Sequence, residues 1–123
     1  MTEKQLHLQI CTYLKLQYPK IIFATDGSGL RVSIGEAKRL KKLRSSNGIP
    51  DIIIFRPNKS HNGLFLEVKA KSPFKKDGYL YANVHLREQW QMIIKLKCLK
   101  YEALFVWNFE MAKKTIDNYM QEI

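Results

Sequence analysis

Three residues in the middle of the chain, Asp51, Glu67 and Lys69, carry side chains that could do chemistry together. Carboxylate oxygens are the hard ligands that Mg²⁺ and Mn²⁺ take in proteins. A cation held by them polarises a phosphate and lowers the pKa of a bound water. An amine beside the cation can orient that water or offset the charge that builds on the phosphate. These residue types therefore indicate a candidate site for metal-assisted hydrolysis of a phosphate ester.

The spacing of Glu67 and Lys69 predicts that both side chains leave the same face of a strand. Segment 64–70 is β-prone, and alternate side chains of a strand point to opposite faces. One face would carry Leu64, Leu66, Val68 and Ala70, and the other would carry Phe65, Glu67, Lys69 and Lys71. A strand with such an apolar face lies well inside a small domain, where a carboxylate and an ammonium need a strong reason to be.

Asp51 stands at the head of a neighbouring apolar segment. Residues 52–55 are Ile-Ile-Ile-Phe, a run typical of a strand buried on both faces. Residues 56–63 are rich in turn-forming types and predict a hairpin-like connection to the next strand. Pairing of the two strands would bring Asp51 towards Glu67, with the backbone carbonyl of Val68 as a further oxygen ligand.

Each half of this pattern also has an ordinary structural explanation. A Pro-Asp pair before a strand is a common turn. A Glu-Val-Lys alternation is common on exposed strands, where its ion pair contributes less than roughly 1 kcal/mol. The combination is more specific than either half, because both motifs fall on adjoining strands of a strongly basic chain.

The remaining segments predict the framework that positions these residues. A capping-box pattern, Thr2-x-x-Gln5, opens a helix. Four segments have the pattern of helices, and two further apolar runs are β-prone. The predicted helices are 3–17, 36–44, 86–99 and 110–122, and the further strands are 21–24 and 103–107. This order predicts one α/β domain over residues 1–123, with a mixed central sheet flanked by helices.

The charge of the chain points to a polyphosphate partner. Its 21 basic and 11 acidic residues give a formal net charge of +10, and nucleic acids relieve the self-repulsion of such a domain. Charge does not separate DNA from RNA, and a basic protein without such a partner is the plain alternative. The candidate DNA-binding residues are Lys38, Arg39, Lys41, Lys42, Arg44 and Lys71, with Arg31, Lys75 and Lys76 extending the surface. Tyr79 and Tyr81 are candidates for stacking on bases, with packing as the alternative.

Other residue types exclude several classes of site and location. Cys11 and Cys98 form neither a disulfide framework nor a zinc-ligand spacing, which favours a reducing, cytoplasmic setting. His7, His61 and His85 form no ligand cluster in the sequence. The first residues lack a signal-peptide pattern, and no apolar run is long enough to cross a bilayer. We therefore expect no membrane partner.

The ordered motifs resemble those of a known nuclease superfamily. Gly48-Ile49-Pro50-Asp51, an apolar strand and then Glu67-Val68-Lys69 after a hairpin resemble the PD-(D/E)XK signature. Within it, the chain is similar to the virus-type replication-repair nuclease family, VRR-NUC, whose pattern is G-x-P-D, then E-x-K, then a helix opening with Gln. The resemblance runs from the first helix to the strand of Trp107. It implies a restriction-endonuclease-like core.

The resemblance also assigns roles to individual residues. It implies that Asp51 and Glu67 bind the metal, that Lys69 is the catalytic lysine, and that Gln89 is the glutamine near the active site. Glu3 corresponds to the acidic residue of the first helix that often completes the metal site.

Periodicity gives independent support for the two helical residues. Gln89 falls on a buried stripe, where an amide needs a partner. Glu3 shares the stripe of Leu6 and Ile10 and is expected to face inward, although the helix dipole alone also favours a carboxylate in a first turn.

The resemblance implies a Mg²⁺-dependent DNA endonuclease, with Mn²⁺ as a substitute. Small stand-alone members from phages and bacteria look like Holliday-junction resolvases of DNA replication and repair, and are thought to act as homodimers. A dimer would present two sites to a branched or duplex substrate. Two alternatives stay open: a restriction-like or flap nuclease on the same fold, and a basic DNA-binding module that does not cut.

Overall fold

The computed structural model describes residues 1–26, 33–43, 45 and 48–122. Helices and strands follow one another in the predicted order of types. The elements of the described residues are α1 (Glu3–Gln17), β1 (Phe23–Thr25), α2 (Ile34–Leu43), β2 (Ile52–Ile54), β3 (Leu64–Val68), α3 (Val84–Cys98), β4 (Glu102–Val106) and α4 (Phe109–Gln121). The α/β class and the mixed sheet that the sequence predicts are therefore confirmed.

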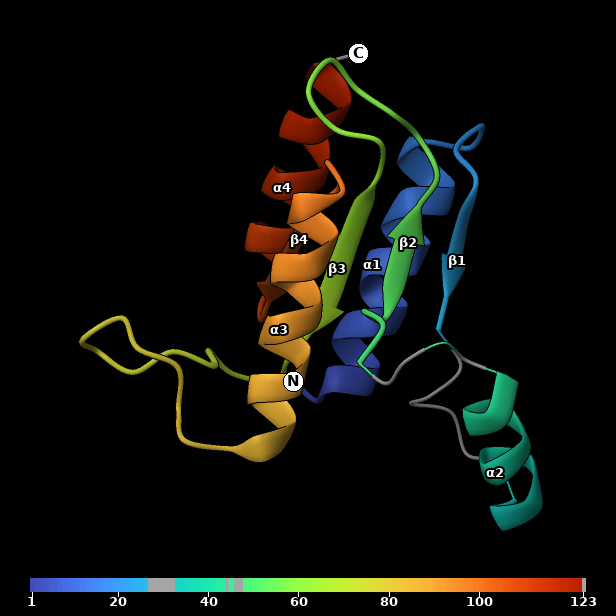
Figure 1. Cartoon of the computed structure of the whole chain (residues 1–123). Coiled ribbons are helices and arrows are strands. Elements are labelled where there is room, and N and C mark those ends of the chain that lie inside the picture. The colour runs from blue at the N-terminus through green and yellow to red at the C-terminus, as the bar shows by residue number, and fades with distance from the viewer. Residues whose placement is uncertain (27–32, 44, 46–47, 123) are drawn as a thin grey trace.

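The strands form one sheet in the order β1-β2-β3-β4 (Figure 1). The pairs β1–β2 and β2–β3 are antiparallel, and the pair β3–β4 is parallel because α3 carries the chain back to the starting end of the sheet. Ile52 lies opposite Leu66 in the β2–β3 pair. One step further along this antiparallel register, Asp51 faces Glu67, as the predicted hairpin requires.

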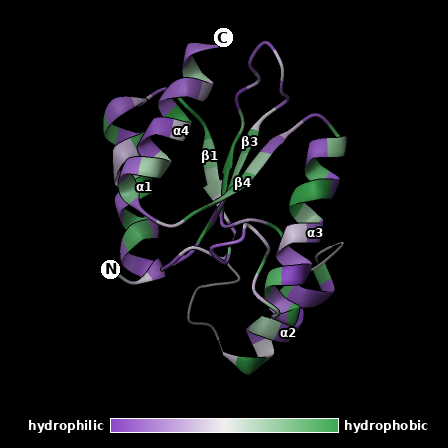
Figure 2. Cartoon of the chain, turned by 90° about the vertical axis from the view of Figure 1, so that its left-hand side faces the viewer, coloured by the Kyte–Doolittle hydropathy of each residue, from purple (hydrophilic) through white to green (hydrophobic). Residues whose placement is uncertain are grey.

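Helices cover the two faces of the sheet from opposite sides (Figure 2). α1 and α4 pack on one face, where Leu64, Leu66 and Val68 of β3 join a core with residues such as Ile10 and Ile116. α3 packs on the other face, together with Phe65 and Phe105. The predicted apolar face of β3 is confirmed as far as Val68. Ala70 lies beyond the end of the strand and is exposed.

Side-chain caps set where the helices of the site begin. At α1, Thr2 Oγ1 accepts a hydrogen bond from the Gln5 N–H at 3.1 Å, and Gln5 Oε1 accepts one from the Thr2 N–H at 2.9 Å. This reciprocal pair is the predicted capping box. At α3, the Asn83 side chain accepts from the Leu86 N–H at 3.1 Å. α1 and α3 both begin at the end of the sheet where β2 begins (Figure 1).

The edge of the sheet differs from the prediction. The first strand was predicted at 21–24 but spans Phe23–Thr25, and Ile22 is 71% exposed. In β2, Ile52 and Ile54 are fully buried, whereas Ile53 is half-buried and Phe55, just past the strand, is 57% exposed. The prediction of burial on both faces was wrong for this half of the sheet. The apolar cluster around α3 centres on β3 and β4, so it leaves the outward face of β2 less covered.

α2 projects from the body of the molecule at the end of the sheet where β2 begins (Figure 1). None of its ten residues is buried. It was predicted at 36–44 and spans Ile34–Leu43, so Arg44, like Arg31, lies outside the described residues.

Candidate active site

The carboxyl groups of Asp51 and Glu67 meet at one end of the sheet. The Val68 N–H donates a hydrogen bond of 2.8 Å to Asp51 Oδ2 and fixes that carboxyl against β3. Glu67 is only 4% exposed. In a strand, the N–H and C=O of one residue point to the same side, so the Val68 carbonyl also faces the Asp51 side. The structure thus brings together the three oxygen donors of the predicted hairpin site.

A glycine and a proline deliver Asp51 to this position. Gly48 has a φ of +84°, in the left-handed region that glycine adopts without a steric penalty. A Cβ there would lie 3.5 Å from the Glu88 carbonyl oxygen of α3, so the turn also runs close to that helix. Pro50 is fully buried. The motif Gly48-Ile49-Pro50-Asp51 therefore anchors the chain before it enters β2.

Gln89 reaches the site from α3. Its Nε2 donates a hydrogen bond of 2.8 Å to Glu67 Oε1, and its side chain is 9% exposed. The prediction that this amide is buried and partnered is confirmed. The Gln89 Oε1 atom is buried and has no hydrogen-bond partner among the described residues. A buried acceptor without a partner usually marks a place for water or a ligand.

Lys69 lies just past the end of β3 and points towards the start of α1. Its Nζ is 3.9 Å from Glu3 Oε1, and its side chain is 15% exposed. Its backbone N–H still donates to the Val106 carbonyl at 2.8 Å, so the strand geometry continues through this residue. The amine is therefore held near the two carboxyl groups by an ion pair and by the backbone of β3.

The prediction that Glu3 faces inward was wrong. Its side chain is 54% exposed, because the first turn of α1 extends beyond the buried part of the helix, which begins at Leu6. The Glu3 carboxylate still belongs to the neighbourhood of the site through its contact with Lys69.

Burial makes the two carboxyl groups hard to ionise together. Burial first, and then the negative charge of Asp51, raise the pKa of Glu67 to about 9, while Lys69 opposes the shift. Burial also raises the pKa of Asp51, against the Val68 hydrogen bond, the electrostatic interaction with His7, a hydrogen bond with Glu67 and the charge of Lys69. Two carboxyl groups in one desolvated site disfavour double ionisation. A divalent cation held between them would reverse this, since it would neutralise both charges.

The donor set fits a hard cation that keeps water ligands. Asp51, Glu67 and the Val68 carbonyl offer oxygen atoms only, as Mg²⁺ and Mn²⁺ prefer. Within the described part of the chain, His, Cys, Asp and Glu side chains form no group of three or more that could hold a metal. Protein carboxylates would thus supply a minority of the ligands, which is usual for Mg²⁺, since it gives up its waters reluctantly.

His7 is a residue that sequence reasoning set aside and that the structure places near the site. It lies one turn after Glu3 on α1, and its electrostatic interaction with Asp51 lowers the pKa of that carboxyl. Its Nε2 atom is buried and has no hydrogen-bond partner among the described residues. The i, i+4 spacing from Glu3 was the available signal, because such residues share one helix face.

The other two histidines lie elsewhere. His61 follows β2, and its Nε2 is 3.9 Å from Glu102 Oε2 at the start of β4, at the far end of the sheet. His85 is exposed near the start of α3. The prediction that the histidines form no cluster is consistent with this placement.

The candidate DNA-binding residues lie on two projections beside the site. Lys38, Arg39, Lys41 and Lys42 are exposed on α2, and Lys71, Lys75 and Lys76 are exposed in the segment after β3. Arg39 lies 3.5 Å from Glu36 on the same helix. Both projections leave the body at the end of the sheet that carries the site (Figure 1).

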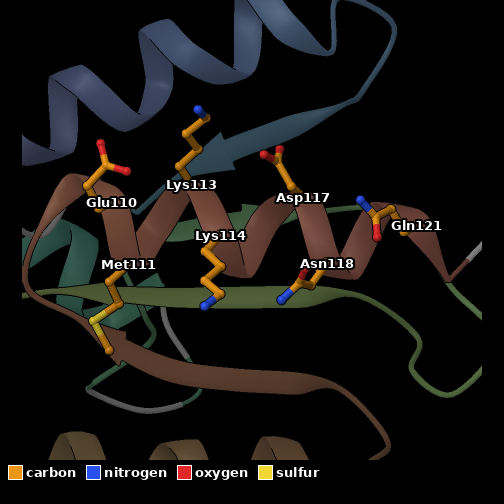
Figure 3. A pocket seen from close by; sticks show the side chains of 7 residues that line it. All are labelled: Glu110, Met111, Lys113, Lys114, Asp117, Asn118 and Gln121. Carbon is orange, nitrogen blue, oxygen red and sulfur yellow. The ribbon is translucent and has the colours of Figure 1, made fainter.

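A surface depression along α4 lies apart from this arrangement. Figure 3 shows side chains of α4 around it, among them Lys114 and Asn118. Its lining residues are Glu110, Met111, Lys113, Lys114, Asp117, Asn118 and Gln121. None of the residues around Asp51 and Glu67 contributes to it, so it is no part of the candidate active site.

Two further findings concern the chain as a whole. Both cysteines, Cys11 and Cys98, are free thiols. Among the described residues, no helix combines the length and the apolar character that crossing a bilayer requires.

Comparison with solved structures identifies a protein of similar fold. No protein-family model and no curated protein matches the chain. Among solved structures, a VRR_NUC domain protein superimposes with a TM-score of 0.68 over 99% of this chain and 90% of that protein, at 21% sequence identity. At this identity the similarity concerns the fold. The chain therefore has a VRR-NUC-like fold, as its ordered motifs implied.

Proposed function

We propose that the protein is a metal-dependent DNA endonuclease that hydrolyses phosphodiester bonds at Asp51, Glu67 and Lys69. One observation carries this proposal: a carboxyl group that is 4% exposed lies beside a second carboxyl and an amine, at the end of a sheet whose other buried residues are apolar. Burial of an ionisable carboxyl group destabilises the fold. Its presence at this position therefore points to a functional role. Perturbed, mutually coupled titratable groups are typical of active sites.

The residues of this site would hold Mg²⁺, or Mn²⁺ in its place. Asp51, Glu67 and the Val68 carbonyl are the proposed protein ligands. The cation, when bound, would supply Lewis-acid polarisation of a phosphate and a water of lowered pKa.

The surrounding residues orient these groups. The Gln89 amide holds Glu67 Oε1 and leaves the other carboxylate oxygen for the cation. The Val68 N–H holds Asp51 Oδ2 in the same way. Lys69 would offset negative charge on the phosphate or orient the attacking water. The ion pair with Glu3 keeps the Lys69 amine near the site.

His7 would complete the site through water. Its buried Nε2 lacks a partner among the described residues, and an unpaired buried nitrogen destabilises a fold by about 1–3 kcal/mol. We assign it to a hydrogen bond with a water of the site, beside Asp51.

The substrate would be DNA, in duplex or branched form. The net charge of +10 and the exposed lysines beside the site support binding to a phosphate backbone. Selectivity for DNA structure and action as a homodimer extend the resemblance to junction-resolving relatives and are part of the proposal. A restriction-like or flap nuclease differs only in substrate, so cleavage of linear, flap and four-way DNA separates these roles.

Replacement of the proposed catalytic lysine tests the reaction directly. Lys69→Ala should abolish cleavage in Mg²⁺ and retain DNA affinity within about twofold, because one of many phosphate-facing charges is lost. Lys113→Ala is the control and should cleave like the wild type, since Lys113 has the same charge but lies exposed on α4, away from the site. Full cleavage by Lys69→Ala would remove the catalytic assignment. DNA binding without cleavage by the wild type, at any Mg²⁺ or Mn²⁺ concentration, would favour the non-cutting module.

A further inference from the structure

The segment between β3 and α3 forms an ordered hairpin rather than a loose loop. The Lys75 N–H donates to the Tyr79 carbonyl at 2.7 Å, and the Tyr81 N–H donates to the Pro73 carbonyl at 3.0 Å. Phe74 and Leu80 face each other in an antiparallel bridge. Gly78, with a φ of +89°, closes the turn. We call this segment, residues 73–81, the arm.

Aromatic packing fixes the base of the arm to the body. The Phe74 ring stands edge-on to Trp90 of α3 at 5.7 Å and to Phe105 of β4 at 5.9 Å, measured between ring centroids. The Trp107 ring centroid lies 6.2 Å from that of Phe74. Edge-to-face pairs at these distances are favourable, so the arm is held at the same end of the molecule as the active site (Figure 1).

The tip of the arm exposes a tyrosine among lysines. The Tyr79 side chain is 73% exposed, and Lys75 and Lys76 beside it are exposed. The Tyr79 N–H donates to Asp77 Oδ1 at 3.0 Å, which orders the backbone that carries the ring. An aromatic ring on a fixed backbone among positive charges is the arrangement that binds unpaired bases of a nucleic-acid strand.

We propose that the arm is a DNA contact in which Tyr79 stacks on an unpaired base near the cleaved bond. This inference rests on the proposed nuclease function and names a feature of its substrate. A base within a duplex has both faces covered by its neighbours, whereas an unpaired base can offer a face to the ring.

The length of the arm limits where that base lies. Tyr79 pairs with Lys75, six residues beyond Lys69. Six extended residues span about 20 Å, and successive nucleotides of one strand are about 3.4 Å apart. The stacked base should therefore lie within about six nucleotides of the cleaved phosphate.

Binding by a non-cleaving protein tests the contact. In a Lys69→Ala background, Tyr79→Ala should weaken binding to a duplex with a short single-stranded gap about tenfold, with little change for an intact duplex. Tyr79→Phe should bind like the parent, because it keeps the stacking ring. A 2-aminopurine in the gap should be quenched by the parent and by Tyr79→Phe, but not by Tyr79→Ala. Lys76→Ala should instead weaken binding to both DNAs equally, since it removes a phosphate contact.

Two outcomes would overturn the proposal: equal losses on gapped and intact DNA for Tyr79→Ala, or no loss on either. Thermal melting of the variants shows whether the exposed tip has changed the fold. Failure of the nuclease function has a different signature. The protein with Lys69 intact would then cleave neither DNA, while the difference between Tyr79→Ala and Tyr79→Phe in binding would persist.

Discussion

At the scale of single residues, the site balances burial against charge. Glu67 lies inside the molecule with one amide hydrogen bond, from Gln89, and Asp51 beside it. The pKa of Glu67 rises from its ordinary value of 4.5 to about 9. Folding therefore favours the protonated form of the metal-free protein. The stability that comes from burying protonated Glu67 is fully present below pH 4.5 and is lost as the pH rises towards 9.

The first prediction concerns this pH dependence. In EDTA, the Tm of the wild type should fall between pH 5 and 8, and Glu67→Gln should raise the Tm at pH 8 by about 3–6 °C. The neutral amide has the same shape and needs no proton to be buried. Glu67→Gln should also lose the Mn²⁺-induced rise in Tm, because a ligand is gone. Scanning calorimetry with and without Mn²⁺ measures both effects.

Glu36→Gln, on exposed α2, is the control and should change neither quantity. A wild-type Tm that is independent of pH in EDTA would mean that Glu67 ionises freely in the fold.

The second prediction concerns His7. His7→Ala should weaken Mn²⁺ binding about tenfold in titration calorimetry, which is typical for loss of a group that orders a metal's surroundings. His61→Ala is a matched control, because His61 also has a buried ring nitrogen, Nδ1, without a partner among the described residues. Its loss should leave the Mn²⁺ affinity unchanged. Equal Mn²⁺ affinity of His7→Ala and the wild type would exclude His7 from the site.

At the scale of elements, the end of the sheet gathers groups from distant segments. β2 brings Asp51, β3 brings Glu67 and Lys69, and α3 brings Gln89. α1 adds Glu3 and His7 from the opposite face of the sheet. α1 is itself tied to α4, since Tyr13 and Tyr18 both donate to Asp117 Oδ1, at 2.5 Å and 2.7 Å. That tie holds α1 against α4.

A third prediction belongs to α2. The double variant Lys41→Glu/Lys42→Glu should weaken DNA binding and reduce the slope of log affinity against log salt by about 2, because two phosphate contacts are lost. Lys113→Glu/Lys114→Glu changes the net charge equally, but on exposed α4 positions away from the site. This control should leave the slope nearly unchanged. Equal effects of the two variants would show that DNA responds to overall charge and not to α2.

At the scale of the whole molecule, much of the architecture follows from local patterns. Helical periodicity, the capping box at Thr2 and the β-prone runs predicted every element type in order. Those signals depend on residues that are close together in the chain, so they can be recognised before the fold is known. The meeting of Asp51 and Glu67 was also predictable, because a one-residue slip in the pairing would turn the apolar face of the strand away from the core.

The contacts between distant segments were not predictable in the same way. Three contacts depend on how α1 and α3 dock on the sheet. They are the Gln89–Glu67 hydrogen bond, the position of His7 beside Asp51 and the contact of Lys69 with exposed Glu3. The exposure of α2 and the anchoring of the arm by Phe74 also depend on the tertiary structure.

The sequence by itself determined the order of elements, the basic charge and the pair of carboxylates at the head of a hairpin, since each arises from short-range spacing. Only the tertiary structure decided which side chains surround that pair. Helix docking depends on the summed packing of many apolar contacts, and no single stretch of the chain encodes that sum.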